Sequence, residues 1–141
     1  MKPRVSAMEN RKARFDYHFI ELWTAGVSLM GSEVKSIKEG LVDFTGSWCE
    51  LTDTGVLCHD LHVTEKSTAF THPVKRVRQL LLTKKEIKRI GRLMDTGLTI
   101  VPVKIFVSDR GLIKMQIALA KGKKTWDKRE TIKARDLERF S

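Results

Sequence analysis

The clearest pattern along the chain is a strict alternation of hydrophobic and polar positions near its C-terminal end. Every second position from 113 to 119 is hydrophobic, at Ile113, Met115, Ile117 and Leu119. The positions between them are Lys114, Gln116 and Ala118. A period of two is typical of a strand with one buried face. We therefore predict a strand whose first set faces the core and whose second set faces away.

An earlier run has the same period and predicts the partner strand. Its hydrophobic positions of equal parity are Val101, Val103, Ile105 and Val107. The sequence Ser-Asp-Arg-Gly at 108–111 supplies turn chemistry between the two runs, so together they predict a β-hairpin over residues 98–120. Pro102 has no N–H to donate to a ladder, so its position predicts an edge or a bulge.

Weaker patterns predict a long strand and a helix near the N-terminus. Aromatic residues alternate from Phe15 to Phe19, and the parity switches at Ile20, which predicts one long strand with a bulge. A short helix follows, with Ser32 as its N-cap and Gly40 at its end. Further strands are expected at about 44–51, 56–61 and 77–82.

The order of these elements indicates the fold class. After the strand at 77–82, the capping box from Thr83 to Glu86 predicts a helix to about residue 96. Short helices and mostly antiparallel strands favour a mainly β fold, a small closed barrel related to the OB-fold with short flanking helices. A split α+β sheet is the alternative. We expect a basic N-terminal arm at 1–13, poorly ordered, the barrel at 14–120 and a basic C-terminal tail at 121–141.

The charge of the chain points to a polyanionic partner. Lys and Arg number 27 against 17 Asp and Glu, which gives a net charge of +10, and the pI is near 9.9. Nucleic acid is the first candidate for such a surplus, and an acidic membrane surface is the second. The sequence has no apolar run long enough to span a bilayer and no signal-peptide core, so we expect a cytoplasmic protein. We also expect Cys49 and Cys58 to be reduced.

Residues suited to enzyme chemistry are scattered. The carboxylates Asp16, Glu21, Glu33, Asp43 and Glu50 lie on separate expected elements, without the spacing of a paired acid and base. His59 and His62 have opposite parity in a strand, so with Cys58 they would not share one metal. The sequence therefore implies no catalytic residue, no metal and no cofactor.

The basic residues, in contrast, are clustered. They gather at 10–14, 84–92 and 121–139, where they could contact phosphates, although a solvated cationic surface is the alternative. An aromatic residue inside a basic run, Trp126, favours RNA because bases can stack on it. If the tail is helical, Lys124, Lys128, Thr131, Arg135 and Arg139 form one stripe, and such a segment would fold only on its partner.

With these segments in hand, the chain resembles the SsrA-binding protein family, the small protein B family of bacterial trans-translation. The resemblance covers about residues 9–136, and its ordered motifs lie at 9–14, 31–36, 77–82 and 122–129. It implies a six-stranded antiparallel barrel whose one face grips the tRNA-like domain of tmRNA. It also implies a tail that lies in the empty mRNA channel of a stalled ribosome, where it is helical, while it is disordered in the free protein.

The resemblance assigns two groups of site residues. Those expected to bind tmRNA are Asn10, Arg11, Lys12, Arg14, Glu33, Lys35, Leu81 and Lys84. Those expected in the decoding centre and mRNA channel are Lys121, Gly122, Lys123, Lys124, Trp126, Asp127, Lys128, Arg129 and Lys133. The implied partners are tmRNA, the rRNA of the small ribosomal subunit and elongation factor Tu bound to alanyl-tmRNA, and we expect a monomer.

Two departures and two rival functions complete the prediction. Thr24 stands where the family usually has a glutamate, and the tail stops at Ser141, earlier than in many relatives. One rival is a ribosomal or general single-strand RNA-binding protein, which would have no preference for a tRNA-like fold. The other is a small basic nuclease, which would degrade RNA in the presence of magnesium.

Overall fold

The computed structural model describes residues 7–64, 76–124 and 128–129. Its longer strands are β2 (Tyr17–Val27), β4 (Trp48–Thr52), β5 (Gly55–His59), β7 (Arg78–Leu81), β8 (Leu98–Val107) and β9 (Ile113–Gly122). Three short strands are β1 (Ala7–Glu9), β3 (Val42–Asp43) and β6 (His62–Val63). The helices are α1 (Arg11–Asp16), α2 (Gly31–Lys38) and α3 (Lys84–Leu93).

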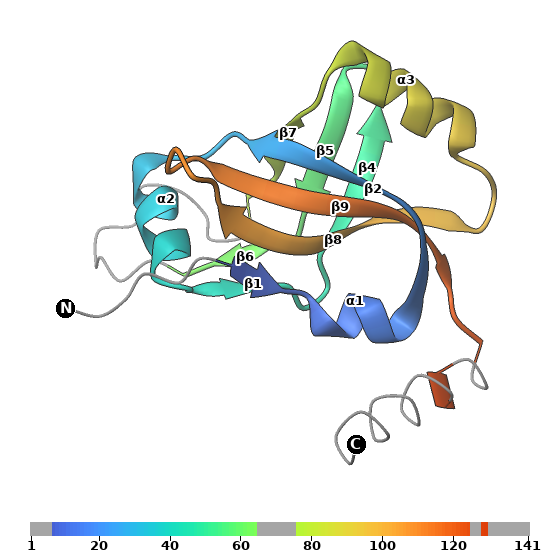
Figure 1. The fold of residues 1–141 in the computed structure, drawn as a ribbon, viewed down its shortest axis with the longest axis horizontal. Helices are drawn as coiled ribbons and strands as arrows, with labels where there is room; N and C mark the ends of the chain where they lie inside the picture. Colours follow the sequence, from blue (N-terminus) through green and yellow to red (C-terminus); the bar gives the residue numbers. More distant parts are fainter. Residues whose placement is uncertain (1–6, 65–75, 125–127, 130–141) are drawn as a thin grey trace.

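The described strands form a ring of antiparallel neighbours (Figure 1). The sheet order is β1-β8-β4-β5-β7-β2-β9, and an additional pairing of β8 with β9 joins the two ends of the run from β8 to β9. Strand β1 lies beside β8 outside this ring, and β3 and β6 form a separate small sheet. The mainly β prediction is thus confirmed, as is the hairpin over 98–120 with its turn, in which the Gly111 N–H donates to the Ser108 carbonyl at 2.8 Å.

Two hydrophobic clusters lie on opposite faces of the hairpin. The inward positions of β9, from Ile113 to Leu119, are buried in the main core as predicted. Ala118 and Ala120 are also buried, in a second cluster that contains Ala13 of α1. Ala118 thus faces away from the main core as predicted, but it is buried because α1 covers this part of the outer surface.

A bulge in β8 changes which residues share a face. The register of β8 with β9 shifts between Pro102 and Lys104, at the proline that predicted a bulge. An extra residue in one strand inverts the alternation beyond it. Consequently Val103 lies in the second cluster while Ile105 lies in the main core, and the prediction of one shared face from Val101 to Val107 is wrong. The bulge predicted in β2 is also present, between Phe19 and Glu21.

Several element ends differ from the sequence prediction. Residues 7–9 of the predicted N-terminal arm pair with β8, and α1 at 11–16 crosses the predicted end of the arm at residue 13. At the other end of the chain, β9 extends to Gly122. Helix α2 has Met30 as its N-cap in place of Ser32, because the Glu33 carboxylate accepts the Met30 N–H at 2.9 Å. The capping box of α3 is confirmed, but the helix ends at Leu93. In the parts of the chain that the structure describes, no helix is long and apolar enough to cross a membrane.

Candidate RNA interface

Asn10 holds α1 against the bulge of β8. Its backbone N–H donates to the Val103 carbonyl and its side-chain amide donates to the Pro102 carbonyl, both at 2.8 Å. Its side-chain oxygen accepts the Ala13 N–H at 3.3 Å and so caps α1. Asn10, a predicted RNA-binding residue, is only 8% exposed, and its side-chain amide makes hydrogen bonds within the protein. A bulge leaves carbonyls without ladder partners, and Asn10 satisfies them.

The predicted tmRNA-binding residues fall into two separate groups. One group is exposed on α1, which directly precedes β2, and consists of Arg11, Lys12 and Arg14. Leu81, in contrast, lies opposite Gly26 near the C-terminal end of β2. Strand β2 has 11 residues, and at about 3.3 Å per residue the two groups are roughly 30 Å apart along it. Figure 1 shows α1 and α2 at opposite ends of β2. The structure therefore does not bring all the predicted residues together.

Leu81 belongs to an exposed apolar strip on the outer face of β2 and β7. It is 58% exposed, and Ile20 and Leu22 on β2 are 52% and 46% exposed. Thr24 is also exposed, two positions after Leu22 on the same face of β2. Gly26 lies close to Leu81 and connects the residues of β2 with β7. We call these five residues the β2 strip. Lys35 on α2 and Lys84 at the start of α3 are both exposed, and Lys84 follows Leu81 by three residues.

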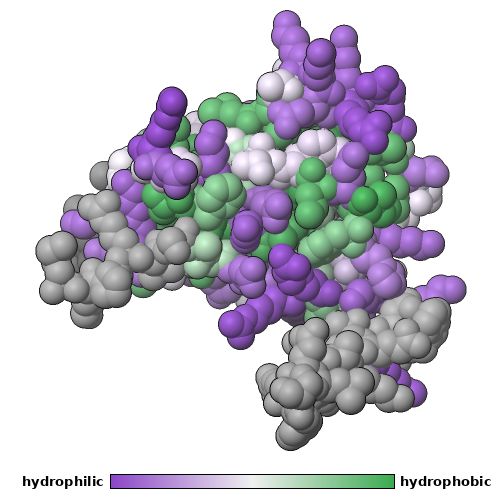
Figure 2. Space-filling model, in the orientation of Figure 1, coloured by the Kyte–Doolittle hydropathy of each residue, from purple (hydrophilic) through white to green (hydrophobic). Residues whose placement is uncertain are grey.

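A basic surface lies beside the β2 strip. The exposed basic residues of α3 are Lys84, Lys85, Lys88, Arg89 and Arg92. Figure 2 shows hydrophilic side chains gathered over this helix, next to hydrophobic surface on the strands. Arg89 alone of this set forms an ion pair among the described residues, with Glu21 at 3.0 Å. Apolar side chains flanked by cations suit RNA, whose bases and sugars offer apolar faces and whose phosphates are anionic.

Glu33 does not lie on this surface. Its side chain is 1% exposed and accepts hydrogen bonds from the Arg78 Nε at 2.8 Å and the Arg76 Nε at 3.1 Å. Burial disfavours the carboxylate, but the bonds from Arg76, from the Met30 N–H and from Arg78 outweigh this, so the pKa of Glu33 is lowered. The Glu33 carboxylate is thus engaged inside the protein by Arg76 and Arg78, and its direct contact with RNA stays a prediction.

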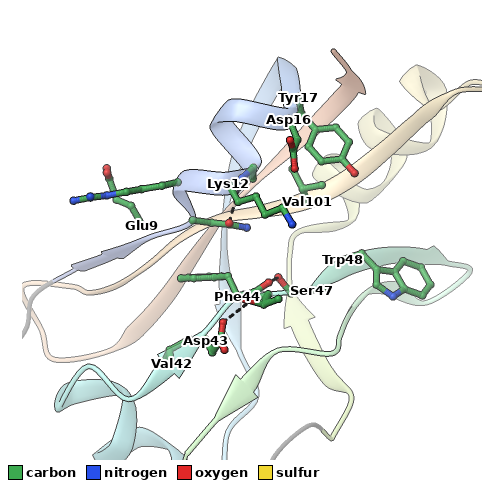
Figure 3. A pocket seen from close by; sticks show the side chains of 15 residues that line it. Glu9, Lys12, Asp16, Tyr17, Val42, Asp43, Phe44, Ser47, Trp48 and Val101 are labelled. Carbon is green, nitrogen blue, oxygen red and sulfur yellow. Dashed lines mark hydrogen bonds between the residues drawn. The ribbon is translucent and has the colours of Figure 1, made fainter. Parts of the chain in front are cut away.

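A pocket of about 500 Å³ lies between α1 and the loop that joins β3 to β4 (Figure 3). Lys12, Tyr17 and Asp16 line it from one side, and Phe44 and Trp48 from the other. We call this the α1 pocket. The loop is held by its own hydrogen bonds, of which the shortest joins the Ser47 hydroxyl to the Phe44 carbonyl at 2.6 Å.

Trp48 presents a planar ring at the edge of the α1 pocket. It is 42% exposed and stacks on His59, with 4.4 Å between ring centroids and 11° between planes. His59 in turn contacts Glu50 at 2.9 Å. A large, partly exposed aromatic ring held in place by a stacked neighbour suits stacking with an unpaired base. Sequence reasoning missed this site, although Trp48 precedes the buried Cys49 in a strand, and that parity would have placed it outside.

The start of the predicted tail continues the same end of the molecule. Lys121 and Gly122 are exposed and pair with His18 and Tyr17 as the last residues of β9. Lys123 is partly exposed and Lys124 exposed, while Lys128 is partly exposed and Arg129 exposed. The predicted residues Trp126, Asp127 and Lys133 lie outside the described residues.

No group of three or more metal-ligating side chains occurs within residues 7–64, 76–124 and 128–129. His59 is engaged by Trp48 and Glu50, and Cys49 and Cys58 are free thiols in the core. The features that the described residues do offer are an exposed indole, exposed apolar side chains and exposed cations.

Comparisons with known proteins point to one family. The model of the SmpB protein family matches residues 7–141. The SsrA-binding protein of Christiangramia forsetii is 44% identical over 135 residues, which are 94% of this chain and 86% of that protein. The SsrA-binding protein of Pseudothermotoga lettingae is 46% identical over 133 residues, with 92% of this chain and 89% of that protein covered.

A solved structure agrees with the sequence matches. A chain from the structure described as "tmRNA-SmpB: a journey to the center of the bacterial ribosome" has a TM-score of 0.73 and is 40% identical. The match covers 86% of this chain and 87% of that one. The resemblance found in the sequence is thereby confirmed, and the chain belongs to the SmpB protein family.

Proposed function

We propose that the protein is an RNA-binding adaptor of trans-translation, which binds the tRNA-like domain of tmRNA and helps it to enter stalled ribosomes. Its relatives are named SsrA-binding proteins, and its structural neighbour is described as part of a tmRNA complex on the bacterial ribosome. The observation that carries the proposal is the presence of two different RNA-compatible surfaces, the β2 strip and the α1 pocket with its neighbouring basic residues. An adaptor between two RNAs needs two such surfaces.

The β2 strip supports the contact with tmRNA. It offers apolar side chains that include Leu81, and exposed Lys35 and Lys84 lie on the helices that follow β2 and β7. A folded RNA corner exposes unstacked bases and sugars that such a strip can cover, while cations fix the register through the backbone. Thr24 is neutral, so this chain avoids placing an additional carboxylate beside the RNA.

The end of the molecule that carries α1 and the start of the tail supports the contact with the small ribosomal subunit. The α1 pocket, the exposed basic residues of α1 and the start of the tail lie together there, and the tail is proposed to enter the empty mRNA channel. We therefore assign Arg11, Lys12 and Arg14 to the ribosomal side, although the resemblance placed them at tmRNA. Elongation factor Tu bound to alanyl-tmRNA enters the proposal as a further partner through the resemblance alone.

A pair of variants tests the division of labour. Leu81→Glu places a charge in the β2 strip and should abolish binding of the tRNA-like domain, while the protein keeps its melting temperature. Trp126→Ala combined with Lys128→Ala should leave that binding nearly intact and prevent tagging of peptides on stalled ribosomes. An unrelated hairpin RNA is the control, because a general RNA-binding protein would bind both RNAs equally.

The opposite results would overturn the proposal. Wild-type affinity of Leu81→Glu for the tRNA-like domain would exclude the β2 strip as the tmRNA contact. Normal tagging by the double variant would show that the tail is a solvated cationic end. Loss of tmRNA binding on replacing Arg11, Lys12 and Arg14 by Gln would return these residues to the tmRNA side. Cleavage of either RNA in magnesium would support the nuclease alternative.

A further inference from the structure

The last turn of α1 receives the backbone and side chain of Lys123. The Lys123 N–H donates to the Asp16 carbonyl at 2.8 Å, and its ammonium donates to the Arg14 carbonyl at 3.2 Å. Carbonyls in the last turn of a helix have no partner within the helix. The residue that follows β9 therefore supplies donors to the C-terminal end of α1.

Lys128 reaches the same place from the next part of the tail. Its ammonium lies 3.3 Å from the Asp16 carboxylate and 5.8 Å from the centroid of the Phe15 ring. Its backbone N–H donates to the Lys124 carbonyl at 3.2 Å, which is the spacing of one helical turn. The two contacts of the Lys128 ammonium hold this residue against the C-terminal end of α1.

The position of Asp16 is unfavourable for α1 by itself. A carboxylate at a helix C-terminus lies at the negative end of the macrodipole, where cations are preferred. The carboxylate and the last carbonyls of α1 together make an anionic end, and Lys123 and Lys128 bring two cations to it. The feature that disfavours Asp16 in an isolated helix thus favours a basic partner.

We propose that the C-terminal end of α1, with Asp16, is a docking site for the root of the C-terminal tail, which we define as Lys123, Lys124 and Lys128. The site takes a short basic segment of this chain and sets the direction in which the tail leaves the ring. Asp16 also lines the α1 pocket, so docking keeps the tail in a fixed relation to that pocket. This last consequence rests on the proposed function, whereas the docking itself does not.

The test measures the tail root in the free, full-length protein by amide hydrogen exchange and ¹⁵N relaxation. Asp16→Asn and Lys128→Gln should each accelerate exchange at the Lys123 and Lys128 amides by roughly 1.4- to 5-fold, the range of an exposed ion pair. Arg129→Gln is the matched control, because it removes the same charge from an exposed neighbour of Lys128. A charge exchange, Asp16→Lys with Lys128→Asp, should restore slow exchange.

The result that would overturn the docking site is equal exchange in all the single variants, including the Arg129→Gln control. Failure of the charge exchange to restore protection would also overturn it. Lys128 lies outside the ring, so its variant tests the contact even if Asp16→Asn loosens α1. Absence of peptide tagging by the wild-type protein would reject the proposed function and leave the exchange result valid.

Discussion

The side-chain amide of Asn10 donates a hydrogen bond to the carbonyl of Pro102, at 2.8 Å and across 92 residues of sequence. The bulge at Pro102 leaves carbonyls without ladder partners, and the first residues of α1 need a cap. The Asn10 side chain meets both needs, because its nitrogen donates to the Pro102 carbonyl and its oxygen accepts the Ala13 N–H. The α1 pocket and the proposed docking site for the tail root both depend on where α1 lies, so this bond supports both.

Asn10→Ala should destabilise the protein by about 1–3 kcal/mol, because it leaves a buried acceptor unsatisfied and removes the helix cap. Asn10→Asp is the matched control, since its carboxylate keeps the cap but cannot donate to Pro102. Chemical denaturation should rank the variants as wild type, then Asp, then Ala. Equal stability of all three would show that the contact carries no energy.

The Glu33 network should determine how the protein responds to acid. A carboxyl whose pKa is lowered by folding stabilises the native state above its unfolded pKa of about 4.3, and this contribution is lost as pH falls through the folded pKa. Unfolding should therefore begin below about pH 4. Glu33→Gln should cost about 3–5 kcal/mol at pH 7, because it leaves Arg78 buried without its counter-ion.

A second variant identifies the origin of that loss. Arg76→Gln removes the more exposed of the two cations and should cost much less than Glu33→Gln, because Arg78 keeps its partner. Urea unfolding at pH 7 and pH 4 measures both. If Glu33→Gln has the same pH dependence as wild type between those values, another carboxylate governs the acid transition.

The two core thiols should be unreactive while the protein is folded. The hydrogen bond with Cys58 and the burial of the group raise the pKa of Cys49 well above its usual range. A disulfide-exchange reagent at pH 8.5 should therefore label both thiols only in urea. Since the unfolded pKa is about 8.5, stability should be complete below that pH and decline above it. Rapid labelling of the native protein would contradict this assignment.

Salt should weaken tmRNA binding steeply if Lys35 and Lys84 contact phosphates. The slope of log affinity against log salt should become shallower by about 0.7 to 0.9 for each of these lysines changed to Gln. Lys104 on β8, whose ammonium lies 5.3 Å from the Phe106 ring centroid, provides a control away from the β2 strip. An unchanged slope in the Lys35 and Lys84 variants would place the phosphates elsewhere.

Trp48→Ala should weaken binding to small-subunit rRNA roughly five- to 150-fold, because stacking on one base is worth about 1–3 kcal/mol. His59→Ala should have a smaller effect, since it removes only the ring that supports the indole. Affinity for the tRNA-like domain should stay constant in both variants. A loss of tmRNA affinity in Trp48→Ala would instead assign the α1 pocket to tmRNA.

Local sequence signals predicted local structure well. The hairpin turn, the capping box at Thr83 and the bulge at Pro102 each depend on residues close together in the chain, and all three are present. The consequence of the bulge was harder to foresee. It moves Val101 and Val103 to the outer face, where their partner is α1, and alternation alone cannot show that a distant helix covers that face.

The same distinction between local and distant signals applies to the surroundings of the predicted site residues. Exposed Leu81 and the basic residues of α1 lie in motifs that the sequence displays. The role of Glu33 could not be predicted, because its partners Arg76 and Arg78 come from a segment more than forty residues away. The α1 pocket exists only where three separate segments meet.

The ring has a consequence for how the chain reaches its native state. Its longest strand, β2, lies near the N-terminus, yet it must pair with β9, so that Tyr17 faces Gly122. Contacts between distant residues slow folding, and domains acquire structure as they are synthesised. Before β8 and β9 exist, β2 and β4 each have an unpaired edge, which is a site for aggregation. The nascent protein therefore carries open strand edges until nearly its whole length has been translated.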